Sequence, residues 1–421
     1  MVCLELSLVT SLIPRGGLYP IMKLRYLIVA MSAGLAGLLL FGATKGRSTN
    51  SDQPYKHLAV FSEVISRIKS DYVEEPDLKG VTAGAVNGLL EAVDPYASYL
   101  SADQFKEYSK KKDQDKGDVG LVLSRRVGYV SVISPIHGSP SASVNLSPGD
   151  LIEAINGVAT RDMPLAYAEM LLRGEPGTSV EITILRIRNA DPQKISLKRE
   201  VLKLPDVTAR MTENQIGLIT ARALEANHVT AIGAKARELE AQGAKKLILD
   251  LRGCAAGAQE NGIALANVFL DKGLIVYLQG QKQARKDFAA EAYKQASKLP
   301  LIVLTNRGTA GAAEIAATGL LENKRAEVVG DRTYGNAGVR RTVTLDDGSA
   351  LILSVAKYYS ASAKAIQDNG VVPTHPVADT ADAGDTDDDD SPATPATPPA
   401  AAKSNEDAPL KKAIELLSKQ G

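Results

Sequence analysis

The chain has few of the residues that build disulfide frameworks and metal centres, and it has no excess of charge of either sign. Two cysteines in 421 residues, Cys3 and Cys254, do not make a disulfide framework. The four histidines are scattered without a ligand spacing, so neither a metal nor a cofactor is expected; they are His57, His137, His228 and His375. Lys plus Arg and Asp plus Glu both number 49, so nothing in the net charge indicates a nucleic-acid partner.

Long apolar runs are also scarce, and the one near the N-terminus, Leu27 to Ala43, predicts export. Residues 1–21 are weakly apolar and broken by proline and glycine, so we interpret them as a doubtful upstream extension and Met22 as the start. Residues 22–43 then form either a cleaved signal peptide or a membrane anchor. The expected location is the cell envelope, periplasmic or extracytoplasmic, with anchoring to the inner membrane in the second case.

Residues 55–112 carry apolar side chains at helical spacing and predict an N-terminal helical segment. Asp94-Pro95-Tyr96 interrupts the pattern before a further helix over 102–109. We expect this segment to be a packing or dimerisation arm.

Residues 301–367 hold the pattern that matters most for function. A buried strand at 301–305 leads through a glycine turn into an alanine-rich helix over 310–321, a shape that presents free backbone N–H groups beside a nucleophile. The turn over 308–313 contains no serine or cysteine, however. A second turn, 334–338, offers Asn336 where a base would be expected, and a hairpin of 339–345 with 350–359 follows.

These two turns carry a resemblance to the carboxyl-terminal processing (tail-specific) serine peptidases. Their motifs run G-S-A-S-A-S-E-I, with the nucleophile at the middle serine, and F-G-K-G-S-V-Q, with a lysine base and a glutamine that orients it. Here GTAGAAEI (308–315) places Gly311 at the nucleophile, and YGNAGVR (334–340) places Asn336 at the lysine and Arg340 at the glutamine. The 25-residue separation of positions 311 and 336 suits the family register. The resemblance therefore implies a catalytically degenerate member, with no intact catalytic residue.

The same resemblance implies that the loop over 250–257 helps to form an oxyanion hole, and this loop also departs from the family. The family sequence is D-L-R-N-N-P-G-G, whereas here it is DLRGCAAG, so only Gly257 remains of the paired glycines. Thr309 and Cys254 are the nearest hydroxyl and thiol. An active serine-type endopeptidase with a relocated nucleophile is therefore the alternative to an inactive protein that binds peptides.

Residues 117–203 resemble a PDZ domain, with Val119, Gly120, Leu121 and Val122 as the expected carboxylate-binding turn and strand. SPGDLI (147–152) and ING (155–157) resemble its central motif, followed by a helix over 165–172 and a final strand over 179–186. Such a domain binds a peptide C-terminus by β-augmentation. The alternative is a module that only packs and gates.

After residue 377 the composition becomes rich in Ala, Asp, Thr and Pro, which predicts a disordered acidic linker over 378–405. Residues 406–421 then form an amphipathic helix that docks on its own chain or on a second subunit.

The sequence thus predicts a multidomain α+β protein, in which the resemblance implies an inserted PDZ domain and a ClpP/crotonase-like α/β peptidase core over 204–377. The expected partners are peptide or protein C-termini, with an active paralogue, a homo-oligomer or the membrane as further candidates.

Overall fold

The fold was obtained as a computed structural model, which describes residues 52–114, 116–144, 146–186, 189–378 and 407–419. The contacts divide the chain at Leu78 into two units. Of the first unit, the structure describes α2 (Asp52–Asp71), an amphipathic helix on which Leu58, Phe61 and Val64 are exposed. The predicted leader and acidic linker lie outside the described residues.

The second unit begins with two more helices and a short strand, which confirms the mainly helical prediction for this segment. These elements are α3 (Leu78–Val93), β1 (Ser98–Leu100) and α4 (Ala102–Gln114). α4 runs five residues beyond the predicted helix end at residue 109. β1 was not predicted; it pairs antiparallel with β16.

A PDZ-like module follows, built on a sheet in the order β2-β3-β4-β6-β7 with β5 on β4. Its elements are β2 (Leu121–Arg126), β3 (Tyr129–Pro135), η1 (Pro140–Ser143), β4 (Leu151–Ile155), β5 (Val158–Ala159), α5 (Leu165–Leu172), β6 (Ser179–Arg186) and β7 (Asn189–Lys198). The prediction that β6 is the final strand is wrong. β7 pairs with β6 at the sheet edge, and its sequence, NADPQKISLK, is mostly polar.

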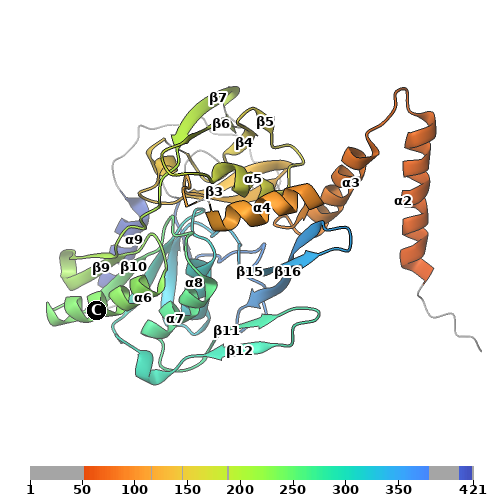
Figure 1. The fold of residues 1–421 in the computed structure, drawn as a ribbon. Coiled ribbons are helices and arrows are strands. Elements are labelled where there is room, and N and C mark those ends of the chain that lie inside the picture. Colours follow the sequence, from red (N-terminus) through yellow and green to blue (C-terminus); the bar gives the residue numbers. More distant parts are fainter. Residues whose placement is uncertain (1–51, 115, 145, 187–188, 379–406, 420–421) are drawn as a thin grey trace, which may run out of the picture. The chain divides into compact units, whose positions relative to one another are not determined.

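The core of the unit is a sheet in the order β17-β14-β13-β10-β9-β8, parallel except for β8. Its elements are β8 (Thr208–Met211), η2 (Glu213–Gln215), β9 (Ile216–Thr220), α6 (Ala226–Ala241), β10 (Lys246–Asp250), α7 (Gln259–Phe269), β13 (Leu301–Thr305), α8 (Ala312–Glu322), β14 (Ala326–Gly330) and β17 (His375–Pro376). Helices α6, α7 and α8 gather on one side of this sheet (Figure 1).

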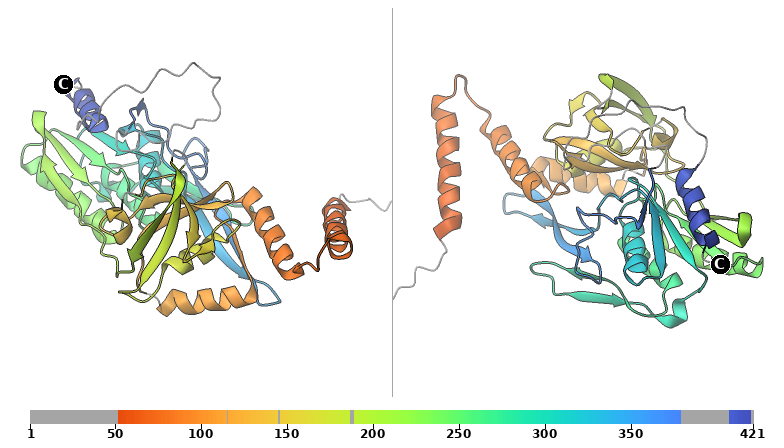
Figure 2. Two further views of the ribbon diagram at one scale, coloured as in Figure 1. Left: turned by 90° about the horizontal axis from the view of Figure 1, so that it is seen from above. Right: turned by 180° about the vertical axis from the view of Figure 1, so that it is seen from behind.

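The strands of this sheet are apolar at successive positions because both faces are covered. Leu247 and Leu249 face the three helices, whereas Ile248 between them faces α9 (Ala408–Lys419). Figure 2 shows α9 against the strands, on the side away from α6 and α7. The predicted terminal helix is therefore present, and it docks on its own chain.

A second, antiparallel sheet flanks the core in the order β1-β16-β11-β12, with β15 on β16. It consists of β11 (Leu274–Gln279), β12 (Lys286–Ala289), β15 (Gly338–Thr344) and β16 (Ala350–Tyr359), with η3 (Ala292–Lys294) after β12. The predicted hairpin is β15 and β16. The α+β, multidomain fold class is confirmed.

Candidate functional site

The nucleophile position, Gly311, lies at the start of α8 in a turn with positive φ. Its backbone has φ 63° and ψ −118°, a conformation that residues with a side chain rarely adopt. A Cβ built there would have only the Asn336 carbonyl oxygen within 4 Å, at 3.7 Å. The two positions that the sequence aligned with nucleophile and base therefore do lie together, and there is room for a side chain that the chain does not supply.

One buried carboxylate, Glu314, holds the two turns against each other. It accepts the N–H groups of Gly311 at 2.9 Å, Gly335 at 2.6 Å and Asn336 at 2.8 Å, and the Thr333 hydroxyl at 2.5 Å. Burial raises the pKa of Glu314, while these four donors act in the opposite direction. The sequence analysis gave Glu314 no role. The signal that could have revealed it is a single charged residue in an otherwise apolar stretch, AAEIAA (312–317).

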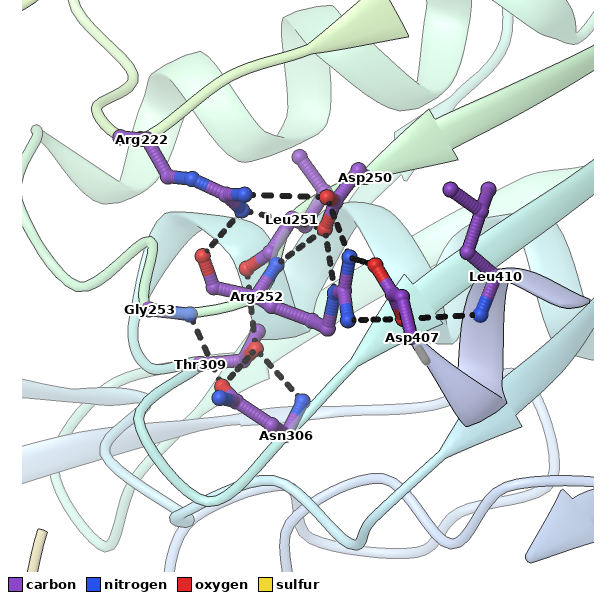
Figure 3. Close-up of polar contacts among 9 residues, drawn as sticks. All are labelled: Arg222, Asp250, Leu251, Arg252, Gly253, Asn306, Thr309, Asp407 and Leu410. Atoms are coloured by element: carbon purple, nitrogen blue, oxygen red, sulfur yellow. Dashed lines mark hydrogen bonds and ion pairs between the residues drawn. The ribbon is translucent and has the colours of Figure 1, made fainter. Parts of the chain in front are cut away.

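Thr309, one of the two substitute nucleophiles, is fully buried and fully engaged in the turn. Its hydroxyl donates to the Leu251 carbonyl at 2.9 Å and accepts the Asn306 N–H at 3.1 Å. These bonds fix the strand-to-helix connection (Figure 3). The hydroxyl is therefore already committed to the turn.

Cys254, the other substitute, is also buried. Burial raises the pKa of its thiol to about 12, so it is not a thiolate at neutral pH. His137, from the PDZ-like module, lies against the neighbouring Gly253: its Cε1 is 2.7 Å from where a Gly253 Cβ would be. Burial lowers the pKa of His137, which favours the neutral ring. No sequence signal connected residues 137 and 253.

Backbone and side-chain hydrogen bonds connect the 250–257 loop to the turn over residues 306–311, which we call the nucleophile turn. Gly253 N–H donates to Asn306 Oδ1 at 2.8 Å, and Ala310 N–H donates to the Cys254 carbonyl at 3.0 Å. Gly257 has φ 129°, and a Cβ there would lie 2.1 Å from the Leu224 carbonyl oxygen. Only glycine fits at position 257, so this remaining family glycine has a structural reason.

Arg340, at the position of the orienting glutamine, is exposed. Its guanidinium carbon lies 5.2 Å from the centre of the Tyr96 ring, and the Tyr96 hydroxyl is 3.5 Å from the Gly335 carbonyl. Arg340 lines a small pocket of about 210 Å³ with Tyr108 and Glu169. Burial raises the pKa of Glu169, and the charge of Arg340 opposes this rise.

The expected peptide-binding residues lie where β2 begins. β2 is an edge strand, Leu121 and Val122 open it, and Val119 is buried in the core of the module. Gly120 has φ 78°, and its N–H donates to Asp118 Oδ1 at 2.8 Å. A donor at this turn thus already holds a carboxylate.

Strand β2 also reaches the second turn. The hydroxyl groups of Ser124 and Tyr334 form a short hydrogen bond, and Tyr334 precedes Gly335 and Asn336. The PDZ-like module therefore contacts the turn that carries the base position.

Neither a metal site nor a membrane helix is found in the described part of the chain. Across residues 52–378, apart from the four undescribed positions within them, and 407–419, no three His, Cys, Asp or Glu side chains are placed to hold a metal. The helices over the same residues include none long and apolar enough to cross a membrane.

Comparison with known proteins defines the class to which this arrangement belongs. Residues 215–377 match the model of peptidase family S41, and residues 132–186 match that of the PDZ domain. The carboxy-terminal processing protease CtpA of Bacillus subtilis is 33% identical over 319 residues, covering 74% of this chain and 67% of the relative. A carboxy-terminal-processing protease of Bartonella bacilliformis is 30% identical over 344 residues, covering 80% and 79%.

The chain therefore belongs to the S41 family, among the carboxyl-terminal processing peptidases with a PDZ domain. A solved structure of a photosystem II D1 C-terminal processing protease shares the fold, with a TM-score of 0.63 and 24% identity over 78% of this chain and 94% of that one. The family and fold implied by the sequence motifs are confirmed.

Proposed function

We propose that this S41 family member is proteolytically inactive and binds the C-termini of peptides or proteins as a scaffold or adaptor. The observation that carries the proposal is the glycine at position 311. Glycine has no side chain to attack a carbonyl carbon, so no acyl-enzyme forms there. The Asn336 amide cannot take up the proton that such an attack releases.

Neither substitute residue restores the chemistry. The Thr309 hydroxyl is committed to the Leu251 carbonyl, and the Cys254 thiol is protonated and buried. Loss of the catalytic residues of a serine protease leaves about 10³–10⁴-fold acceleration over water. Such a rate is negligible for peptide-bond hydrolysis on a biological timescale.

The PDZ domain supplies the binding function in this proposal. Among the described residues, edge strand β2 pairs only with β3, which suits an added peptide strand on its other side, and the Gly120 turn presents an N–H group to a carboxylate. A C-terminal carboxylate would take the place that the Asp118 side chain now occupies. The chemistry recognised is therefore an extended peptide with a free C-terminus, including that of an active paralogue.

We further propose that the protein is exported to the cell envelope. Lys23 and Arg25 precede the apolar run, and this order is typical of a signal peptide or an anchor. Membrane fractionation, with mass spectrometry of the mature N-terminus, tests this step. A cytoplasmic protein that keeps residue 22 at its N-terminus would refute it.

One experiment tests inactivity and binding together. Purified protein is incubated with an unstructured protein, and no cleavage is expected; cleavage that Thr309→Ala or Cys254→Ala abolishes would refute inactivity. Binding is measured by fluorescence anisotropy with a peptide library carrying either free or amidated C-termini. We expect binding only with the free carboxylate, and equal binding of both forms would refute the proposed mode.

Gly120→Ala and Gly157→Ala form a matched pair for the binding measurement. Both glycines have positive φ, 78° and 76°, so both substitutions strain the backbone. An alanine Cβ at position 120 would lie 2.2 Å from the Ser139 Cβ, whereas nothing lies within 4 Å of one at position 157. Gly120→Ala should therefore abolish binding, while Gly157→Ala should retain it.

A further inference from the structure

The C-terminal helix α9 docks on the core sheet through a small apolar face. Ala413 and Leu417 are fully buried, and Leu410, Ile414 and Leu416 are partly buried beside them. The sheet residues that receive them are Ile216, Leu218, Ile248, Ile302, Leu304 and Val329. The contact is small, and a lone 12-residue helix is marginal in water, so docking and helix formation are coupled.

The N-terminal end of α9 is fixed by charge. Asp407 Oδ1 accepts the Leu410 N–H at 3.1 Å and so caps the helix. The same carboxylate forms a two-pronged ion pair with Arg252, with both N–O distances 2.8 Å (Figure 3). The Asp407 side chain is 38% exposed and that of Arg252 is 12% exposed, so solvent reaches the pair from one side.

Arg252 belongs to the 250–257 loop and connects Asp407 to a second, buried carboxylate, that of Asp250. It donates to Asp250 at 3.0 and 2.9 Å, and Arg222 donates to the same carboxylate at 3.0 Å through both terminal nitrogens. Arg222 also donates to the Arg252 carbonyl at 2.5 Å. Burial alone would raise the pKa of Asp250, but the hydrogen bonds and charges of the two arginines lower it below its usual range.

The far side of the loop is bound to the turn that precedes Gly311. The Leu251 carbonyl accepts the Thr309 hydroxyl, and the Gly253 N–H donates to Asn306 (Figure 3). A continuous set of bonds thus runs from Asp407, the residue that caps α9, through the loop, to the turn that precedes Gly311.

We propose that α9 is a latch on the 250–257 loop. Docking of the helix places Asp407 against Arg252, which holds the loop on Asp250 and on the nucleophile turn. Release of the helix removes the Asp407 carboxylate from Arg252, which keeps Asp250 as an acidic partner, and lets the loop open more often. This coupling does not depend on whether the protein cleaves or binds peptides.

Cys254 reports on the loop directly, because its thiol is buried in the closed loop and reacts only when the loop opens. The measurement is the rate of Cys254 alkylation by iodoacetamide in the native full-length protein. Cys3→Ser, in the background of every variant, removes the other thiol.

One substitution in α9 and one at the residue that caps it test the two ends of the latch. Leu417→Lys places a charge in the apolar contact and should raise the alkylation rate by at least about thirtyfold. Asp407→Asn keeps a good helix cap but removes the charge that pairs with Arg252, and should raise the rate about three- to fivefold. The wild-type rate should also increase with salt, while that of Asp407→Asn should not.

Two controls separate the latch from general loss of stability. Lys412→Ala removes a half-buried side chain that pairs with Glu415 of the same helix, and should leave the rate unchanged. Leu239→Ala makes a cavity in the core under α6, away from α9, and should leave the rate in the absence of denaturant unchanged as well. A wild-type rate in both Leu417→Lys and Asp407→Asn would overturn the latch, as would an equal increase in Leu239→Ala. If Leu417→Lys fails to fold, Asp407→Asn and its salt dependence decide.

Discussion

Replacing Glu314 by glutamine should strongly destabilise the core, although the two side chains have nearly the same shape. Each carboxylate oxygen accepts two donors: one takes the N–H groups of Gly311 and Asn336, and the other takes the Gly335 N–H and the Thr333 hydroxyl. An amide has a single acceptor oxygen. Its NH₂ group faces either the two N–H groups of Gly311 and Asn336 or, in the better orientation, the Gly335 N–H and the Thr333 hydroxyl, which can accept from it.

The magnitude follows from the Gly335 N–H, which loses its charged acceptor and is left buried without a partner. A hydrogen bond to a charged group contributes about 1.5–3 kcal/mol and an unpaired buried donor costs about 1–3 kcal/mol, so Glu314→Gln should cost about 2.5–6 kcal/mol. Because the chain lacks tryptophan, unfolding in urea is best followed by far-UV circular dichroism. Amide exchange over α8 gives the local measure and should be about 10²–10⁴-fold faster in the variant.

Glu322→Gln, at the other end of the same helix, is the matched control. Glu322 accepts one hydrogen bond, from the Ser362 hydroxyl, and a glutamine oxygen can still accept it. This control should stay within about 0.5 kcal/mol of wild type. A cost of less than about 1 kcal/mol for Glu314→Gln would refute the role of Glu314 as the brace between the turns.

Three further outcomes are expected. Gly257→Ala should destabilise the core by at least about 2 kcal/mol in urea unfolding, because its Cβ would overlap the Leu224 carbonyl. Asp250→Asn should cost about 3–5 kcal/mol at neutral pH. Since the folded-state pKa of Asp250 is lowered, its contribution is complete above about pH 4 and is lost as the pH falls further, so the two urea midpoints should converge there. Gly311→Ser combined with Asn336→Lys should give no proteolysis of an unstructured protein, because the 250–257 loop is altered too.

Each of these predictions has a specific contradicting result. Gly243→Ala is the control for position 257: it also has positive φ, 99°, but nothing lies within 4 Å of its Cβ, and an equal cost for both would contradict the overlap argument. A difference between wild type and Asp250→Asn that stays constant from pH 6 to pH 2.5 would contradict the lowered pKa. Robust proteolysis by the double variant would show that the loop is competent as it stands.

The proximity of the two turns could be predicted from the sequence only through the resemblance to the peptidase motifs. Glycine turns between apolar runs specified the positions of β13, α8 and the hairpin, and the resemblance implied that positions 311 and 336 lie together. Strand β7 could not be predicted in this way. It is a polar edge strand with Pro192 in it, and such strands lack the apolar pattern that marks buried ones.

The contacts between distant side chains in the site could not be predicted from sequence patterns, for a different reason. Asp407 and Arg252 are 155 residues apart, and ion pairs have no periodicity that would reveal them. The same holds for His137 against Gly253 and for Ser124 with Tyr334, which join the PDZ domain to the core. These contacts arise only once independent elements have folded and packed.

The positive φ at Gly311 has a consequence for how this chain can evolve. A residue with a side chain at such a backbone position costs roughly 1–2 kcal/mol of stability. In an active enzyme, selection for activity keeps the serine there despite this cost. With glycine there, the turn is free of that cost, and folding itself favours the present residue. Mutation and selection for stability should therefore preserve glycine at position 311. A return to catalysis would require several substitutions together, and the one at position 311 would lower the stability of the fold.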